Sequence, residues 1–157
     1  MEIQVFSHEN ADAVIHLMKE NSFQFPDMVI ERYPDRWRQF IETPTSQSHY
    51  YVARLGDKIV GHAGYIWNDE DSIFEIVGVV VSLNKQRQGI GQRLIEWICQ
   101  DLKLKGEQQV FLTTLGHERN EGTVAFYERL GFENVKNEQD YFTEGYSRIT
   151  FWKKLEK

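Results

Sequence analysis

The sequence predicts a single α/β domain over residues 1–157, in which a mixed central sheet of about six or seven strands is flanked by about four helices. Three observations support this prediction. The length of 157 residues suits one domain. A hydrophobic fraction of 41% is enough for a core of its own. Stretches with the period of a strand and stretches with the period of a helix follow one another, without an internal repeat or low-complexity linker.

The first third of the chain begins with a strand and continues with two helical stretches. Residues 2–6 alternate polar and apolar side chains, and Ser7 is a suitable N-cap for the helix that follows. Apolar side chains at helical spacing over 11–18 predict that helix. A second helical stretch runs from 26 to about 41, and we expect Pro34 to break or kink it.

The middle of the chain predicts three strands and a long helix. Residues 50–67 contain two strand-like runs around the turn residues Gly56-Asp57, which is typical of a hairpin. Residues 72–81 are rich in β-branched side chains and predict the central strand. A stripe of apolar side chains predicts a helix from residue 90 to about 106.

The last third predicts four shorter elements. These are a strand over 109–114, a helix over 121–130, an extended segment over 132–136 and a final strand over 147–152. The predicted order of the whole chain is therefore β-α-α-β-β-β-α-β-α-β-β.

Composition and charge exclude several classes of protein. There are 18 basic and 24 acidic residues, so the net charge is −6 and argues against binding to long nucleic acids. The longest apolar stretch, 76–81, is too short to cross a bilayer, and the N-terminus lacks a signal peptide. A single cysteine, Cys99, forms no internal disulfide, and the histidines show no ligand-like spacing. We expect a cytoplasmic protein with no metal site and no membrane or nucleic-acid partner.

A glycine loop is the most informative segment. The apolar strand 79–81 runs into a loop, and Gly89 and Gly91 stand where the next helix begins. The first turn of a helix has unpaired N–H groups and the positive end of the dipole, so it can bind phosphate. Residues 82–95 carry three basic side chains and no acid. This local charge favours a polyanionic ligand.

Two other phosphate-binding loops do not fit this segment, and one ordinary interpretation stays open. The P-loop needs a Gly-Lys-Ser or Gly-Lys-Thr ending, which is absent. The dinucleotide-binding fingerprint needs a third glycine where this chain has Leu94. A glycine-rich turn between a strand and a helix, without a ligand, remains the alternative.

Two motifs together resemble a known family. The segment Gln86-x-x-Gly89-x-Gly91 resembles the acetyl-CoA pyrophosphate motif of the GNAT superfamily of N-acetyltransferases. Asn120, with Tyr127 seven residues later and a Gly-Phe pair after it, resembles the second signature of that family. With the order of elements, the resemblance covers essentially the whole chain and implies a GNAT-like fold.

The resemblance implies acetyl-CoA as co-substrate, no metal, and acetyl transfer to a primary amine by direct attack in a ternary complex. The strand backbone would pair with the pantetheine arm, and the loop amides would hold the pyrophosphate. The implied cofactor-binding residues are Val79, Val80, Val81, Arg87, Gln88, Gly89, Ile90, Gly91, Gln92 and Asn120. As alternatives, the valines are a core strand and Asn120 is a helix N-cap.

Two side chains are candidates for catalysis. Tyr127 matches the family position that donates a proton to the departing thiolate, although it also lies on an apolar helical stripe and could be a core residue. Glu75 interrupts an apolar strand, eleven residues before Gln86, where the histone-acetylating branch of the family has its general base. A structural ion pair with an arginine is the alternative for Glu75. Strict alternation places it on the face of Val77 and Val79 unless a bulge near Gly78 intervenes.

The acceptor is not identified by the sequence, and we expect a small cationic amine with an apolar portion. Carboxylates that would attract it are Asp69, Glu70 and Asp71 before the central strand, and Glu138, Asp140 and Glu144 in a loop before the last strand. Apolar walls would come from Phe23, Phe25, Tyr33, Trp37, Tyr141 and Phe142, and His117 and Glu118 could line the acceptor side. The alternative is that these acids only keep the surface soluble.

An alternative function belongs to a different class: an acyl-CoA-binding regulatory or sensor module with weak or no catalysis. Release of CoA thiol in the presence of an amine distinguishes the two functions. The resemblance also makes a homodimer one option, because dimers are common among proteins that resemble this family.

Overall fold

The computed structural model describes residues 1–45 and 47–155. The strands are β1 (Glu2–Val5), β2 (Ser48–Leu55), β3 (Lys58–Asn68), β4 (Ile73–Val81), β5 (Gln109–Gly116), β6 (Glu133–Thr143) and β7 (Tyr146–Lys154). The α-helices are α1 (Ala11–Glu20), α2 (Asp27–Ile30), α3 (Tyr33–Glu42), α4 (Ile90–Leu104) and α5 (Glu121–Arg129). Short 3₁₀ helices cover His8–Asn10, Leu83–Lys85 and Glu118–Asn120.

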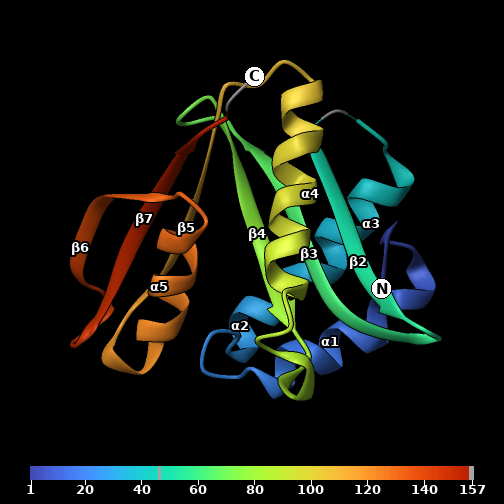
Figure 1. Ribbon diagram of the computed structural model, residues 1–157, viewed down its shortest axis with the longest axis horizontal. Helices are drawn as coiled ribbons and strands as arrows, with labels where there is room; N and C mark the ends of the chain where they lie inside the picture. The colour runs from blue at the N-terminus through green and yellow to red at the C-terminus, as the bar shows by residue number, and fades with distance from the viewer. Residues whose placement is uncertain (46, 156–157) are drawn as a thin grey trace. The chain divides into compact units, whose positions relative to one another are not determined.

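The strands form one seven-stranded mixed sheet in the order β1-β2-β3-β4-β5-β7-β6 (Figure 1). The β4–β5 pair is parallel, whereas β1–β2, β2–β3, β5–β7 and β6–β7 are antiparallel. Four helices have nine or more residues, and α2 is a single turn of four. The predicted fold class is therefore confirmed.

Contacts divide the chain into two compact units. The first contains residues 1–67 and 76–100, and the second contains residues 68–75 and the chain from Asp101 onward. β4 contributes to both, because its first three residues belong to the second unit and the remainder to the first.

In the first unit, neighbouring residues of β3 face different helices. A Cβ added to Gly61 would lie 3.0 Å from Leu94 and 3.1 Å from Ile90, so this face of β3 packs directly on α4. The next side chain, His62, instead accepts a hydrogen bond from Trp37 of α3. Successive side chains of a strand point to opposite faces, so α4 covers one face and α3 the other.

The face opposite α4 carries the core of the first unit. Its buried members come from the residue after β1, from α1, the segment between α1 and α2, α2, α3, β2 and β4: Phe6, Val14, Leu17, Met18, Phe25, Ile30, Tyr33, Trp37, Tyr50, Val52 and Val80. At roughly 1.5–3 kcal/mol for each large apolar side chain, this cluster is the main force that holds the helices on the sheet.

Strand β4 changes face near Gly78. Both Val77 and Val80 pack against this core, although strict alternation would send residues three apart to opposite faces. Gly78 lies between them with φ +68°, a left-handed conformation that favours glycine. One extra residue in the strand therefore restores Val80 to the core, as expected for a β-bulge.

The second unit is built around β5, β7 and α5. Val110, Phe111 and Leu112 of β5 are all buried, which indicates that both faces of this strand are covered. β7 pairs with β5 over its whole length, and β6 pairs with β7 as an edge strand (Figure 1). On α5, Tyr127 packs against Phe132 and Phe151.

Two predictions of secondary structure need correction. The helical stretch from 26 to 41 is two helices, and Pro34 lies in the first turn of α3 rather than at a kink, because the missing N–H of proline costs nothing there. The segment around Glu138 and Asp140 is not a loop: it belongs to β6. Nearly all side chains of β6 are exposed, so the strand has no hydrophobic alternation to signal it.

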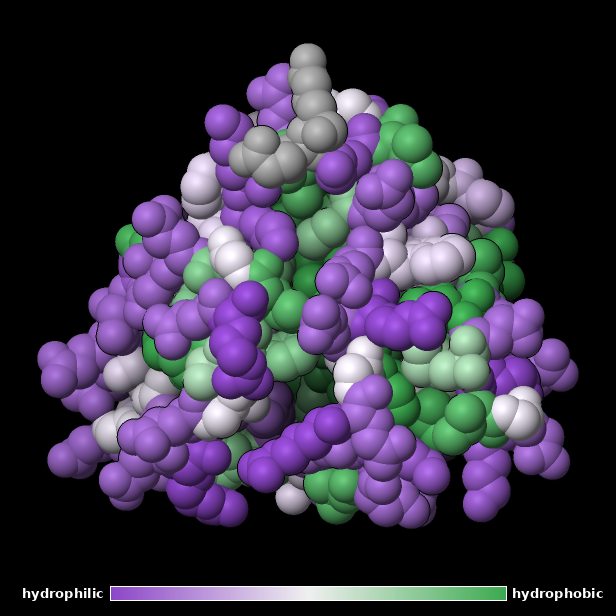
Figure 2. Space-filling view, in the orientation of Figure 1, coloured by the Kyte–Doolittle hydropathy of each residue, from purple (hydrophilic) through white to green (hydrophobic). Residues whose placement is uncertain are grey.

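The face shown in Figure 2 is mostly hydrophilic, with apolar residues in smaller patches, in agreement with a chain that is 27% charged. Within residues 1–45 and 47–155, no helix has both the length and the apolar character needed to cross a membrane.

Candidate active site

The glycine loop enters α4 through two left-handed residues. Arg87 has φ +64° and Gly89 has φ +83°. The Arg93 N–H donates to the Gly89 carbonyl over 3.0 Å, which starts the helix. A Cβ added to Gly89 would meet no described atom within 4 Å, so the space beside this backbone is open. The loop therefore offers backbone that a ligand can approach closely.

The side chains around this loop match an anion. Lys85, Arg87 and Arg93 are its basic residues, and the first turn of α4 contains no acid. Arg87, Gln88, Gly89 and Gln92 are exposed, Gly91 is half-buried, and Ile90 is buried against the sheet. The exposed amides, local positive charge and helix dipole suit the pyrophosphate of acetyl-CoA.

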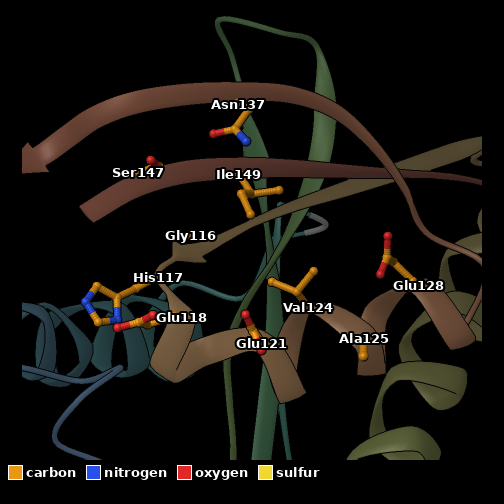
Figure 3. Close-up of a pocket in the computed structure, with 10 residues that line it drawn as sticks. All are labelled: Gly116, His117, Glu118, Glu121, Val124, Ala125, Glu128, Asn137, Ser147 and Ile149. Carbon is orange, nitrogen blue, oxygen red and sulfur yellow. The ribbon is translucent and has the colours of Figure 1, made fainter. Parts of the chain in front are cut away.

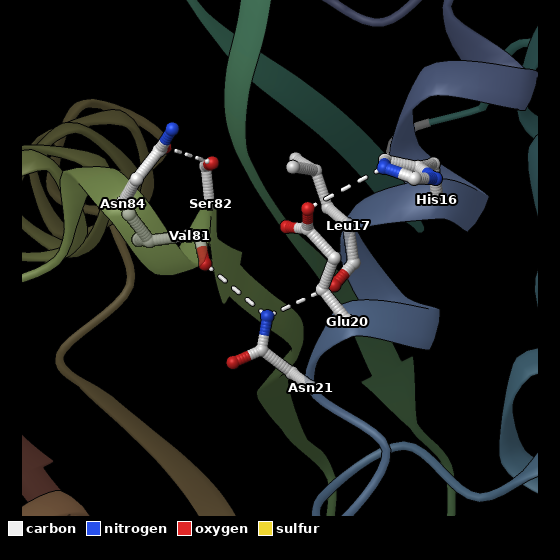
Figure 4. Close-up of polar contacts among 7 residues, drawn as sticks. All are labelled: His16, Leu17, Glu20, Asn21, Val81, Ser82 and Asn84. Carbon is white, nitrogen blue, oxygen red and sulfur yellow. Dashed lines mark hydrogen bonds and ion pairs between the residues drawn. The ribbon is translucent and has the colours of Figure 1, made fainter.

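Asn21, which the sequence analysis did not single out, ties this loop to α1 and β4. Its Nδ2 group donates to the Leu17 carbonyl over 2.9 Å and to the Val81 carbonyl over 3.2 Å (Figure 4). Its Oδ1 atom accepts from Gln86 Nε2 over 3.0 Å. Gln86 opens the phosphate-binding motif, so one carboxamide joins the end of α1, the end of β4 and the loop.

The strand predicted to pair with the pantetheine arm is partly core. Val80 is buried in the first unit's core, whereas Val79 and Val81 are half-buried. Burial in the core involves the side chain of Val80, whereas pairing with the pantetheine arm would involve the backbone of the strand. Both interpretations of this strand are therefore compatible with the structure.

A buried histidine holds the backbone just before this strand segment. His62 is fully buried, and its Nε2 atom accepts a hydrogen bond from the Trp37 indole over 3.1 Å. An indole N–H is only a donor, so the proton of the neutral ring is on Nδ1. Nδ1 lies 2.7 Å from the Gly78 carbonyl oxygen and donates to it.

Burial lowers the pKa of His62 from 6.5 to about 4, and the bond to the Gly78 carbonyl opposes this shift only in part. The rings of Phe6, Tyr33, Trp37 and Tyr50 surround the imidazole at centroid distances of 5.6–6.0 Å. Protonation would place an uncompensated charge among these rings and point a second N–H at the Trp37 donor. The ring is therefore neutral at ordinary pH.

In the second unit, Tyr127 is buried and only 6% exposed. Its ring touches Phe126, Phe132 and Phe151 at centroid distances of 5.1–5.8 Å. This packing fits the alternative of a core tyrosine as well as that of a proton donor whose ring is held rigid. A catalytic role for Tyr127 stays a prediction.

Asn120 does not cap α5 with its side chain. It is buried, and its Nδ2 group donates to the Leu115 carbonyl over 2.6 Å and to Thr114 Oγ1 over 3.2 Å. Asn120 therefore occupies the N-cap position of α5, as the alternative predicts, although its carboxamide makes no capping hydrogen bond and reaches the end of β5 instead. It fixes where α5 begins relative to that strand, and its contact with a cofactor stays a prediction.

Glu75 is half-buried on β4, where it is in register with Phe111 of β5. The pKa of Arg148 is raised mainly by the hydrogen bond that its Nε donates to Glu138 Oε1 over 2.8 Å, and the charge of Glu75 is the smallest of the causes. The structural ion pair and the general-base role of Glu75 both stay predictions.

A pocket of about 510 Å³ lies in the second unit between α5 and the strands β6 and β7 (Figure 3). Its lining contains three carboxylates and no lysine or arginine: Gly116, His117, Glu118, Glu121, Val124, Ala125, Glu128, Asn137, Ser147 and Ile149. His117 stacks on Tyr146 at a centroid distance of 4.6 Å. The pocket lining includes His117 and Glu118, which were predicted for the acceptor side, and also Glu121 and Glu128, which the sequence analysis did not single out.

Three of the six aromatic residues predicted as walls for the acceptor are core residues, whereas Phe23 is half-buried and Tyr141 and Phe142 are exposed. Phe25, Tyr33 and Trp37 are buried in the first unit's core and line no described pocket. Two of the carboxylates predicted to attract the acceptor already have partners. Glu138 forms an ion pair with Arg148, and Asp140 Oδ1 accepts a hydrogen bond from the Gly145 N–H over 2.7 Å. The sequence indicated aromatic and acidic residues near the acceptor, but it did not indicate the contacts that these side chains make within the protein.

Among the described residues, no group of three or more His, Cys, Asp or Glu side chains is arranged to hold a metal ion. The predicted site residues thus gather in two sets. The first unit contains the loop and the strand Val79–Val81, and the second contains Glu75, Asn120 and Tyr127.

Comparison with known proteins identifies the family. A family model described as the acetyltransferase (GNAT) family matches residues 14–132. The fold is similar to that of a protein from Desulfovibrio desulfuricans assigned to the GNAT family, with TM-score 0.89, 19% identity and 99% of each chain covered. No curated protein sequence matches this chain.

Two further solved structures are similar in fold. An aminoglycoside 6'-N-acetyltransferase complexed with coenzyme A has TM-score 0.79 and 20% identity, covering 100% of this chain and 98% of the other. The ribosomal-protein-S18-alanine N-acetyltransferase from Escherichia coli has TM-score 0.76 and 17% identity, covering 99% of this chain and 94% of the other.

The buried histidine predicts how stability depends on pH. The unfolded chain binds a proton at His62 below about pH 6.5, whereas the folded protein resists it until about pH 4. Stability from this group is therefore complete above pH 6.5 and is lost as the pH falls towards 4. By linkage, the free energy of unfolding should decrease by about 3 kcal/mol over this range.

Urea unfolding at several pH values measures this decrease. The variant His62→Asn is the control, because other groups titrate equally in both proteins. Parallel profiles for the two proteins would contradict the prediction.

Proposed function

The chain belongs to the acetyltransferase (GNAT) family, and we propose that it transfers an acetyl group from acetyl-CoA to a primary amine of a small cationic molecule. The observation that carries this proposal is the exposed loop before α4, where Arg87 and Gly89 are left-handed and no acid is present. This arrangement supports the pyrophosphate site that the family implies.

The proposed reaction is direct attack. The neutral amine nitrogen attacks the thioester carbonyl, a C–N bond forms and the C–S bond breaks. Glu75 takes a proton from the incoming ammonium, and Tyr127 gives a proton to the departing thiolate. The nitrogen loses its second proton as the amide forms, and this proton returns through solvent to the Tyr127 phenolate. Negative charge that develops on the carbonyl oxygen needs a donor, and we assign this task to the Val79 N–H.

The acidic pocket supports a cationic acceptor. Glu118, Glu121 and Glu128 line it and are exposed, and no described residue forms an ion pair with any of them. Three uncompensated carboxylates around one pocket favour a ligand with positive charge besides the amine that reacts. The valine, alanine and isoleucine in the lining supply the apolar contact.

The first prediction tests the loop. In Gly89→Val, the new side chain should displace the ligand from the backbone, so the Kd for CoA should rise about 100-fold through loss of one or two charge-assisted hydrogen bonds. Isothermal calorimetry measures the Kd. Gly106→Val is the matched control, because Gly106 also has positive φ, +90°, and open space. An unchanged CoA affinity in Gly89→Val would show that the ligand lies elsewhere.

The second prediction tests the proton donor. Tyr127→Phe removes one hydroxyl, so kcat should fall about 10²–10⁴-fold while the fold and the CoA affinity survive. CoA-thiol release measures kcat. Tyr50→Phe is the control, because the Tyr50 hydroxyl is buried without a hydrogen-bond partner among the described residues. Undiminished turnover in Tyr127→Phe would make water the donor.

Glu75→Gln gives the complementary test in the same assay. If Glu75 deprotonates the ammonium, the pH profile of kcat should change shape. If Glu75 only pairs with an arginine, stability should fall and the shape of the profile should stay as it is.

The third prediction tests the acceptor with a panel of amines. Dicationic acceptors should have higher kcat/KM than monocationic ones of equal length. The double variant Glu121→Gln/Glu128→Gln should lower kcat/KM for dications about three- to tenfold, as expected for two exposed charge contacts. Asp57→Asn, which removes a charge in the β2–β3 turn, should leave kcat/KM for dications unchanged.

Preference for anionic or large protein acceptors would contradict the acceptor proposal. CoA binding without thiol release for any amine would instead favour the alternative function, an acyl-CoA-binding regulatory module.

A further inference from the structure

A hydrogen bond between His62 and Gly78 sets the direction of one peptide group in β4. The Gly78 carbonyl points at His62 Nδ1, 2.7 Å away. The peptide bond between Gly78 and Val79 is trans, so its N–H points opposite to its carbonyl. The Val79 N–H therefore faces away from His62.

The histidine is locked from all sides, so it can act as a fixed support. Trp37 donates to Nε2 and thereby keeps the proton on Nδ1. The Tyr50 ring stacks on the imidazole at an interplanar angle of 20°, and the Phe6, Tyr33 and Trp37 rings meet it at steep angles. No rotation of the ring is available without moving the core.

Gly78 is fitted to this support. A Cβ at this position would lie 2.9 Å from the rings of both His62 and Tyr33, and φ is +68°. The absence of a side chain lets the carbonyl approach the imidazole, and the bulge turns the following peptide away from it.

We propose that His62 is a positioning residue for acetyl transfer: by holding the Gly78 carbonyl it orients the Val79 N–H towards the acetyl carbonyl oxygen. This inference rests on the proposed function. A donor fixed before the reaction costs no reorganisation when charge develops, which is why its orientation affects kcat more than substrate binding.

The titratable groups that face His62 do not disturb this role in the assay range. Burial raises the pKa of Tyr50 on β2 above its usual range, so this phenol is neutral. Tyr33 on α3 also faces the imidazole, and the Arg36 guanidinium lies over the Tyr33 ring, 5.2 Å from its centroid. The imidazole is therefore neutral above about pH 5, because burial lowers the pKa of His62 to about 4.

Two amide variants separate the two hydrogen bonds of His62. In His62→Asn, the Nδ2 atom is bonded to Cγ as Nδ1 is, so a donor to Gly78 remains. In His62→Gln, the longer side chain carries its amide to the position of the imidazole Nε2. The Oε1 atom of the amide can then accept from the Trp37 indole, whereas the donor to the Gly78 carbonyl is lost. Both variants are buried amides of similar polarity, which makes them a matched pair.

The two variants should differ in kcat but have similar KM values for acetyl-CoA. His62→Asn should keep kcat within about fivefold of the unmodified protein. His62→Gln should lose about 10- to 100-fold, approaching the 10²–10³-fold loss seen when an oxyanion donor is removed. The KM for acetyl-CoA should stay within about threefold in both. Equal kcat in the two variants would overturn the inference.

Nuclear magnetic resonance tests the same geometry without turnover. The ¹⁵N spectrum of the imidazole should show a proton on Nδ1 and none on Nε2, and a proton on Nε2 would overturn the inference. The Val79 amide cross-peak should shift when acetyl-CoA binds, and in His62→Gln this shift should be lost.

These readouts keep the two hypotheses apart. If acetyl-CoA binds and shifts the Val79 cross-peak but no amine releases thiol, the proposed function fails and the orientation of Val79 stands. If thiol is released and the Val79 cross-peak does not respond to acetyl-CoA, the proposed function stands and the role of His62 fails. Both results are available even if one of the variants does not fold, because thiol release and the response of the Val79 cross-peak are measured on the unmodified protein.

Discussion

Inside β4, the backbone of Gly78 adopts a left-handed conformation in a place where a Cβ would collide with two aromatic rings. The rings of Tyr33 and His62 can approach the strand only because residue 78 lacks a side chain. Their approach lets α3 dock with Trp37 against His62, and the extra residue in the strand returns Val80 to the core. The packing of a helix, the burial of a histidine and the direction of a peptide group thus depend on one glycine.

Much of the fold could be predicted because the buried elements leave a clear pattern in the sequence. The helix α4 has a stripe of apolar side chains at helical spacing, and the strands β2 to β4 are rich in apolar, β-branched and aromatic residues because consecutive residues in them are buried. The edge strand β6 was missed beyond residue 136 because both of its faces are exposed, and its hydrogen bonds to β7 leave no trace in hydrophobic patterning. The division between α2 and α3 was expected at Pro34, yet the helix ends earlier and proline begins the next one.

The site was predictable where chemistry requires adjacent residues and unpredictable where it depends on distant ones. The glycines and cations of the loop lie together in sequence because a helix start is a local structure. Asn21 reaches Gln86 across 65 positions, and His62 reaches Gly78 across 16, so spacing carries no signal for either contact. Phe25, Tyr33 and Trp37, which were expected at the acceptor, are core residues, because the sequence does not distinguish a ring buried in the core from one that lines a pocket.

The carboxamide of Asn21 has a consequence for the entropy of ligand binding. Because it bonds at once to the last turn of α1, to the Val81 carbonyl and to Gln86, the loop is ordered before any ligand arrives. A loop that is already ordered loses less conformational freedom when it closes on an anion, so more of the contact energy is realised as affinity. Under the proposed function, helix α1, which contributes no residue to the glycine loop, would thereby help to set how tightly that loop binds CoA.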